Sequence, residues 1–226
     1  MDEGEEKESF VQVFKNSLFN CISNPQSKWI TLAGSLRMVV MFAADYFLPL
    51  FFLLSFPDFK TQFSLLYGLI SIVLGFTSVM SGGILADKLG AKNPAAYAKI
   101  CQVASILGWP CMMICLLFSS NFYLSIGMIG AKYLLGEFFW SPNITMMQKA
   151  IPAKDFGRYI SAYQFIITIS GCISSFVVGS LINYFNCGTN PVMIGRIVAA
   201  VLTFGYLGSA FCWTKAERNF VGHINN

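Results

Sequence analysis

Long runs of apolar residues, separated by short polar connections, are the main pattern along this chain. A membrane hydrocarbon layer about 30 Å thick is crossed by roughly 20 helical residues. Six runs are long enough, and the fourth is the least apolar. We therefore predict an all-α membrane protein with six transmembrane helices, over residues 29–55, 64–85, 95–118, 122–148, 159–185 and 191–213.

Ahead of the first span, apolar residues recur every four positions with polar residues between them. The repeat consists of Phe10, Phe14, Leu18 and Ile22. This pattern predicts a short amphipathic helix on the inner membrane surface. The alternative is a connector from a preceding domain, because the acidic residues before the repeat suit a solvated linker.

Basic residues are distributed unequally between the two ends of the predicted helices. With a cytoplasmic N-terminus, only Lys60 falls in an outer loop. Eleven fall on the inner side, namely Lys7, Lys15, Lys28, Lys88, Lys92, Lys99, Lys149, Lys154, Arg158, Lys215 and Arg218. Because cytoplasmic loops are enriched in Lys and Arg, we expect both termini to be cytoplasmic. The predicted organisation is a cytoplasmic segment at 1–28, a six-helix bundle at 29–213 and a cytoplasmic tail at 214–226.

The composition agrees with residence in a lipid bilayer. Hydrophobic residues make up 55% of the chain and charged residues 12%, whereas a soluble domain has about 25% charged residues. The seven cysteines are scattered and join no histidine in a metal-binding pattern. The spans contain no Ser–His, paired-Asp or HExxH arrangement. We therefore expect no enzymatic activity, no cofactor or metal, and no nucleic-acid partner.

The stretch GGILADKLGAKNPAA at 82–96 contains two motifs with different functional meanings. Its second half holds Asn93-Pro94-Ala95, the tripeptide of water channels, and a second Asn-Pro pair begins at Asn190. A water channel needs each motif to open a half-helix before the next span, but the final run is long enough for one span only. Another Asn-Pro pair precedes the first span. Asn caps helices and Pro begins them, so we interpret all three pairs as helix starts.

The first half of this stretch fits the pattern G-x-L-A-D-[RK]-x-G-x-[RK] between the second and third predicted helices. The matching residues are Gly83, Leu85, Ala86, Asp87, Lys88, Gly90 and Lys92. In this position the pattern resembles the signature loop of the major facilitator superfamily, whose members have two six-helix halves. Glycines let helices approach closely, and Asp87 can bind a helix N-terminus or a basic residue. Ala91 stands where many members have Arg, which weakens the charge relay that latches the inner gate.

Other segments resemble the same superfamily. Residues 151–158, ending in Gly157-Arg158, are similar to its loop between helices four and five, so Arg158 joins the implied cytoplasmic gate. Residues 134–142 resemble the fourth helix of its sphingolipid-transporter-like (spinster) branch, and residues 46–57 resemble the start of a C-terminal half.

The resemblance implies half of a secondary transporter that moves a small organic or lipid-like amphiphilic solute by alternating access. A second six-helix half would come from the same chain in a longer protein or from a homodimer. The alternative is a non-transporting half-size membrane protein that pairs with a full-length relative and regulates it.

Four ionisable residues inside the predicted spans are candidates for the transport pathway. Arg37 and Asp45 lie in the first span, and Lys132 and Glu137 lie in the fourth. Each such residue costs about 2.5–3.5 kcal/mol on insertion scales. Depth along the helices matches Arg37 with Glu137 and Asp45 with Lys132, and the first and fourth helices line the cavity in the superfamily. In the functional interpretation these residues bind a charged head group or exchange a proton. In the structural alternative they are ion pairs that fix the helix register.

Small residues form stripes along the second and fifth predicted helices. The stripes consist of Gly68, Gly75 and Gly82, and of Gly171, Ser175 and Gly179. Such stripes permit close helix packing in lipid. In the superfamily these two helices face the other half, so the resemblance implies a partner surface. Packing within the same bundle is the alternative.

Overall fold

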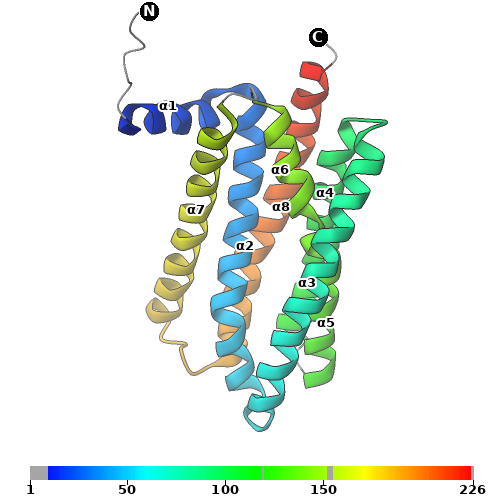
Figure 1. Cartoon of the computed structure of the whole chain (residues 1–226). Coiled ribbons are helices and arrows are strands. Elements are labelled where there is room, and N and C mark those ends of the chain that lie inside the picture. The colour runs from blue at the N-terminus through cyan, green and yellow to red at the C-terminus, as the bar shows by residue number, and fades with distance from the viewer. Residues whose placement is uncertain (1–9, 119, 152–154, 225–226) are drawn as a thin grey trace, which may run out of the picture.

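The computed structural model describes residues 10–118, 120–151 and 155–224, and all regular structure in these ranges is helical. Five helices are long and apolar enough to cross a membrane. They are α2 (Pro25–Ser55), α3 (Lys60–Gly90), α4 (Ala95–Leu117), α7 (Phe156–Tyr184) and α8 (Pro191–Ile224). These helices run along a common axis, and the start of α1 (Phe10–Ser23) and the end of α8 lie at the same end of the bundle (Figure 1).

The fourth predicted span is interrupted. It consists of α5 (Phe122–Gly136), the 3₁₀ turn η2 (Glu137–Phe139) and α6 (Trp140–Lys149). With 15 residues, α5 alone is shorter than a membrane span, so the predicted span corresponds to α5, η2 and α6 together. The prediction of one continuous helix is wrong here.

The residues around η2 explain the interruption. Gly136 has a low helix propensity and ends α5. Pro142 follows in the first turn of α6 and has no N–H to bond the carbonyl of Phe138. Two helix-weakening residues thus flank Glu137, and the chain turns more tightly between them.

The three Asn-Pro pairs stand at helix starts, as predicted. α2 begins at Pro25 and α8 at Pro191. The Asn190 side chain accepts a hydrogen bond from the Met193 N–H at 3.2 Å, and the Asn93 side chain accepts one from the Ala95 N–H at 3.0 Å, where α4 begins. Because α4 and α8 continue from these starts as single helices, the water-channel arrangement is contradicted.

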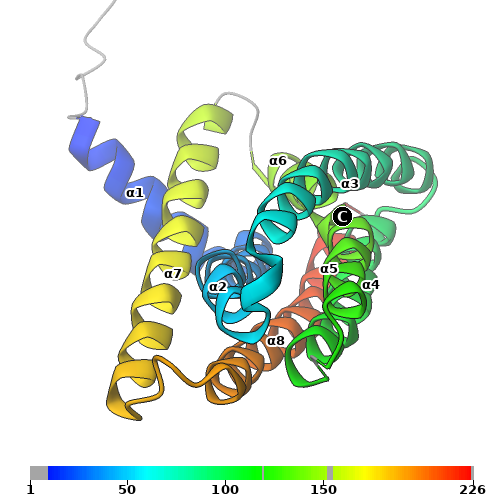
Figure 2. The same ribbon diagram turned by 90° about the horizontal axis from the view of Figure 1, so that it is seen from below.

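The helices form one bundle around α2. α2 packs against α7 on one side and α8 on the other, α4 packs against α8 and α5, and α3 lies beside α5, η2 and α6. Viewed along the axis, α3 and α7 stand apart on opposite sides of α2 (Figure 2). Their outer faces carry exposed apolar side chains, including Leu65, Leu69, Ile72, Phe76, Ile169, Ile173 and Phe176.

The buried apolar residues form two clusters. One lies toward the termini and contains Phe139, Trp213 and Phe220. The other lies toward the opposite end and contains Phe51 and Tyr206. The turn η2 therefore lies where the two halves of the core meet.

The short helix predicted ahead of the first span is α1, and it lies across the end of the bundle (Figure 1). The Phe14 ring packs edge-on against Phe165 of α7, with centroids 5.5 Å apart. Asn20 Nδ2 donates a hydrogen bond to the Tyr159 hydroxyl at 2.9 Å. Ile22, although part of the predicted stripe, is 54% exposed. α1 is thus held by α7 and α2 through only part of that stripe.

The last helix extends beyond its predicted end. α8 runs through Ile224, so most of the segment predicted as a tail at 214–226 continues this helix. Glu217 lies 3.5 Å from Lys99 of α4. Phe220 is buried and contacts the Tyr97 ring. These contacts fasten α8 to α4 near the termini.

The glycine stripes are in part packing surfaces within this bundle. A Cβ atom on Gly82 would lie 2.5 Å from the carbonyl oxygen of Phe138, so α3 approaches the backbone of η2 closely. A Cβ atom on Gly171 would lie 2.7 Å from the Phe42 ring of α2. At both positions the structure agrees with the alternative interpretation, packing within the same bundle.

The other stripe residues are less constrained. A Cβ atom on Gly75 would lie 3.5 Å from the Tyr133 ring, and one on Gly179 would lie 3.7 Å from Phe47, both ordinary contact distances. Ser175 is half-buried on α7. Gly68 faces open space, because nothing lies within 4 Å of an added Cβ atom.

We predict that Gly82→Ala destabilises the bundle while Gly68→Ala does not. The new methyl group at 82 meets backbone that cannot rotate away, and such overpacking costs about 1–3 kcal/mol. The measurement is the thermal unfolding midpoint of the purified variants in detergent, followed by circular dichroism. Equal midpoints for the two variants would show that α3 and η2 separate easily.

Candidate functional site

Three neighbouring helices donate side-chain hydrogen bonds to backbone carbonyls around the interruption. The bonds are Arg37 Nη2 of α2 to Gly136 O at 2.7 Å, Ser78 Oγ of α3 to Leu134 O at 2.8 Å and Cys101 Sγ of α4 to Phe139 O at 3.5 Å. The irregular backbone is therefore enclosed by protein on three sides.

Arg37 is fully buried beside this turn. Its guanidinium carbon lies 4.4 Å from the centroid of the Phe139 ring and 4.7 Å from that of Tyr206. One ring belongs to each half of the core, so the cation joins the two halves by cation–π contacts. Its Nε and Nη1 make no hydrogen bond within the described residues.

Lys132 and Glu137 form a buried ion pair across the interruption. Lys132 Nζ lies 2.8 Å from Glu137 Oε1, and the two residues are 1% and 3% exposed. The indole Nε1 of Trp140 donates to the other carboxylate oxygen at 3.1 Å. The predicted pairing of Glu137 with Arg37 and of Lys132 with Asp45 is wrong, because depth counting assumed a straight helix. The turn at Glu137 and the long Lys132 side chain instead bring two residues of the same segment together.

Asp45 belongs to a separate polar cluster farther along α2. Its carboxylate accepts hydrogen bonds from the hydroxyls of Tyr67 at 3.2 Å and Tyr133 at 3.5 Å. The two hydroxyls lie 3.2 Å apart. Among the four predicted pathway residues, Asp45 alone is exposed. The structure thus places three of the four charges around the interruption and the fourth on an accessible surface.

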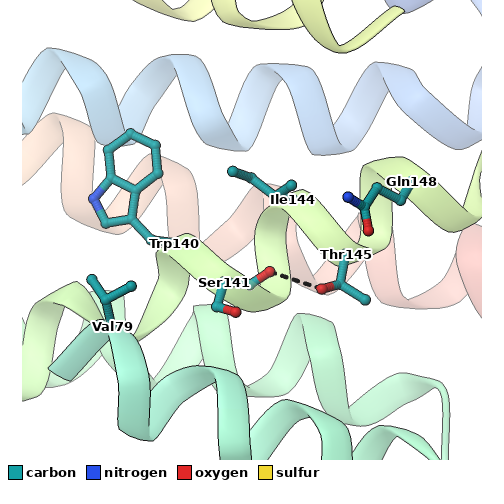
Figure 3. Close-up of a pocket in the computed structure, with 6 residues that line it drawn as sticks. All are labelled: Val79, Trp140, Ser141, Ile144, Thr145 and Gln148. Atoms are coloured by element: carbon teal, nitrogen blue, oxygen red, sulfur yellow. Dashed lines mark hydrogen bonds between the residues drawn. The ribbon is translucent and has the colours of Figure 1, made fainter. Parts of the chain in front are cut away.

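A groove runs along one face of α6, directly beside the buried ion pair. It has a volume of about 560 Å³ and is lined by Val79, Trp140, Ser141, Ile144, Thr145 and Gln148. The five residues from α6 form two adjacent rows with a spacing of four, namely Trp140, Ile144 and Gln148, and Ser141 and Thr145, so they share one helix face (Figure 3). The Thr145 hydroxyl donates to the Ser141 carbonyl at 3.0 Å. Trp140 therefore both lines the groove and holds Glu137.

The predicted gate motif occupies the last turns of α3 rather than a loop, because α3 continues to Gly90. A Cβ atom on Gly83 would lie 2.9 Å from Ser141 Oγ, so this glycine brings α3 against the groove. Gly90 lies directly under the Tyr97 ring. Lys149 Nζ donates to the Tyr97 hydroxyl at 2.8 Å. The motif glycines therefore dock the end of α3 onto α4 and α6.

The charged residues of the motif point outward. Asp87, Lys88 and Lys92 are exposed, and their side chains make no hydrogen bond or ion pair within the part of the chain that the structure describes. Arg158 lies 3.9 Å from Asp155, three residues earlier, and not beside Asp87. Residues 152–154 of the predicted second loop fall outside the described residues.

Sequence reasoning missed Trp140, Tyr97 and the tyrosine pair around Asp45. A signal for Trp140 was present, since the fourth run was the least apolar of the six. Its polar residues Ser141, Thr145 and Gln148 recur at helical spacing and form the groove. Nothing in the sequence indicated which tyrosines would meet Asp45.

Comparison with known proteins relates the chain to a family and to a bacterial protein. The sequence model of the Major Facilitator Superfamily matches residues 2–175. The chain is also 20% identical, over 154 residues, to an MFS-type efflux pump of Mycolicibacterium smegmatis. This alignment covers 68% of the chain and 36% of the pump, so the chain spans about a third of the curated relative that it matches.

We predict that Lys132→Met and Glu137→Gln each lower stability markedly, whereas the double variant recovers part of the loss. Removing one partner leaves the other as an uncompensated buried charge, at a cost of about 3–5 kcal/mol. A double-mutant cycle on thermal unfolding midpoints in detergent measures the coupling. Strictly additive losses would show that the two groups act independently.

Proposed function

The chain belongs to the major facilitator superfamily, and from that membership we propose that it forms part of a secondary transporter that moves a small organic or amphiphilic solute by alternating access. Interrupted helices in transporters form substrate and ion sites near the middle of the membrane. The observation that carries the proposal is such an interruption, with a buried ion pair behind it and a groove in front. The similarity to an efflux pump agrees with a transported solute rather than with the regulatory alternative.

In this proposal the pathway charges have two different roles. Asp45, held by Tyr67 and Tyr133 on an accessible surface, meets the solute or exchanges a proton. Lys132 and Glu137, with Arg37 beside them, act from behind the groove and set the position of Trp140. We propose this division because exposure separates Asp45 from the other three.

We further propose that the end of the bundle that carries the termini is cytoplasmic. The ends of α3 and α6 and the starts of α4 and α7 lie there (Figure 1), and the basic residues outside the spans are concentrated there, as cytoplasmic segments require. Gly83, Asp87, Lys88, Gly90, Lys92 and Arg158 then form the cytoplasmic gate. The exposed charges of Asp87 and its neighbours are free to meet a second half.

A second six-helix half completes the pathway in this proposal. The exposed apolar faces of α3 and α7 flank the groove side of α2 and are suited to packing against it. The second half comes from the same polypeptide in a longer protein or from a second copy. Alternating access then consists of one half rocking against the other around the solute.

We predict that Asp45→Asn lowers the initial rate of solute transport at least tenfold with unchanged protein level. The matched control is Asp58→Asn, because Asp58 is an exposed acid in the 3₁₀ turn η1 (Pro57–Phe59), outside the tyrosine cluster. The assay reconstitutes the native polypeptide into liposomes and follows N-phenyl-1-naphthylamine, rhodamine 6G and 8-anilinonaphthalene-1-sulfonate.

Two results would count against the transport proposal. Equal rates for the wild type and Asp45→Asn would remove Asp45 from the pathway. Transport of all three probes at the rate of protein-free liposomes would refute an amphiphile transporter.

We predict that the native polypeptide in source membranes has about twice the 25.0 kDa mass of this chain, since a second half on the same polypeptide doubles the mass. Immunoblotting with an antibody raised against residues 215–224 measures it. A band at 25.0 kDa would contradict the single-polypeptide form and leave the homodimer as the source of the second half.

A further inference from the structure

We propose that the groove along α6 binds an uncharged amphiphile, with an aromatic or planar apolar part against Trp140 and a hydrogen-bonding end toward Gln148. This inference rests on the proposed transport function for its biological meaning, and it specifies the class of solute.

The shape of the groove sets the size of its occupant. Its α6 residues extend from Trp140 to Gln148 along one helix face (Figure 3). At 1.5 Å per residue this length is about 12 Å. A volume of about 560 Å³ lies within the range of small-molecule sites. The groove therefore suits an elongated molecule of two or three rings, or a short amphiphile of similar length.

The lining combines apolar surface with unpaired polar groups. Val79, Ile144 and the face of Trp140 provide the apolar contacts. The Ser141 hydroxyl and the Gln148 amide make no hydrogen bond within the described chain, while Thr145 uses its proton on the Ser141 carbonyl. The groove thus offers both donors and acceptors, in a row beside an indole.

The lining of the groove, formed by six described residues, contains no charged side chain. The carboxylate of Glu137, which Trp140 contacts, already binds Lys132 as well. An ionic ligand would gain no counter-charge from the lining residues, and an unpaired charge against apolar surface is costly. Neutral molecules are therefore favoured.

The hydrogen bond from Trp140 to Glu137 prepares the binding surface. It fixes the edge of the indole, and the Phe139 ring, with its centroid 5.1 Å away, supports the indole as well. A fixed aromatic surface loses little conformational freedom when a ligand stacks on it. The bound molecule would then lie one hydrogen bond from the buried ion pair.

The test compares two probes that differ by one charge. N-phenyl-1-naphthylamine is neutral, and 8-anilinonaphthalene-1-sulfonate has the same ring system with a sulfonate. Binding to the purified native polypeptide in detergent is followed by energy transfer from tryptophan. We expect saturable binding, at least tenfold tighter for the neutral probe. Trp140→Phe should abolish most of the transfer. Trp109→Phe, which removes a half-buried indole bonded to Thr203 away from the groove, should not.

A second variant tests the charge argument at an exposed position where folding is not at risk. Gln148→Lys adds a cation to the end of the groove. It should tighten binding of the anionic probe at least fivefold and leave the affinity of the neutral probe within twofold.

Unsaturable binding, equal affinity of the two probes for the wild type, or no effect of either groove variant would overturn the proposal. Saturable neutral binding without transport would refute the transport function alone, whereas transport with no effect of Trp140→Phe on binding would refute only the groove.

Discussion

The need to satisfy the backbone of an interrupted helix inside a membrane shapes the whole bundle. Gly136 and Pro142 weaken the helix on either side of Glu137, and the backbone between them is irregular. α2, α3 and α4 each bring a donor to the turn. Those donors fix the register of three helices at one level. Because Gly82 has no side chain, α3 can lie close enough to η2 for Ser78 to donate its hydrogen bond.

The buried charges follow from the same interruption. Arg37 binds the Gly136 carbonyl and lies between two rings from different halves of the core. Lys132 and Glu137 neutralise each other across the turn. These three residues therefore stabilise the irregular segment and leave the adjoining groove without formal charge. In our proposal these structural contacts also determine which solute the groove binds, so the structural and functional interpretations of the buried charges are compatible.

The sequence was sufficient for features governed by local rules and insufficient for those that depend on a tertiary contact. Hydropathy located the five long helices, and the Asn-Pro pairs predicted where α2, α4 and α8 begin. The end of α8 was placed too early, because Phe220 is buried by tertiary packing that includes the Tyr97 ring of α4. The partner of Glu137 was also misassigned, because a 3₁₀ turn between apolar helices does not change the hydropathy pattern. Predicting the groove would have required knowing where each α6 side chain points. The helical spacing of its polar residues alone does not give these directions.

The bond between Arg37 and Gly136 has a consequence for biosynthesis. The two residues are 99 positions apart, so α2 is made long before the carbonyl that its arginine binds. At 5–20 residues per second, the ribosome takes about 5–20 s to reach that acceptor. During this interval the Arg37 guanidinium lacks the carbonyl that it binds in the folded bundle. The order of synthesis thus means that this buried contact of Arg37 forms only after the fourth predicted span has been made.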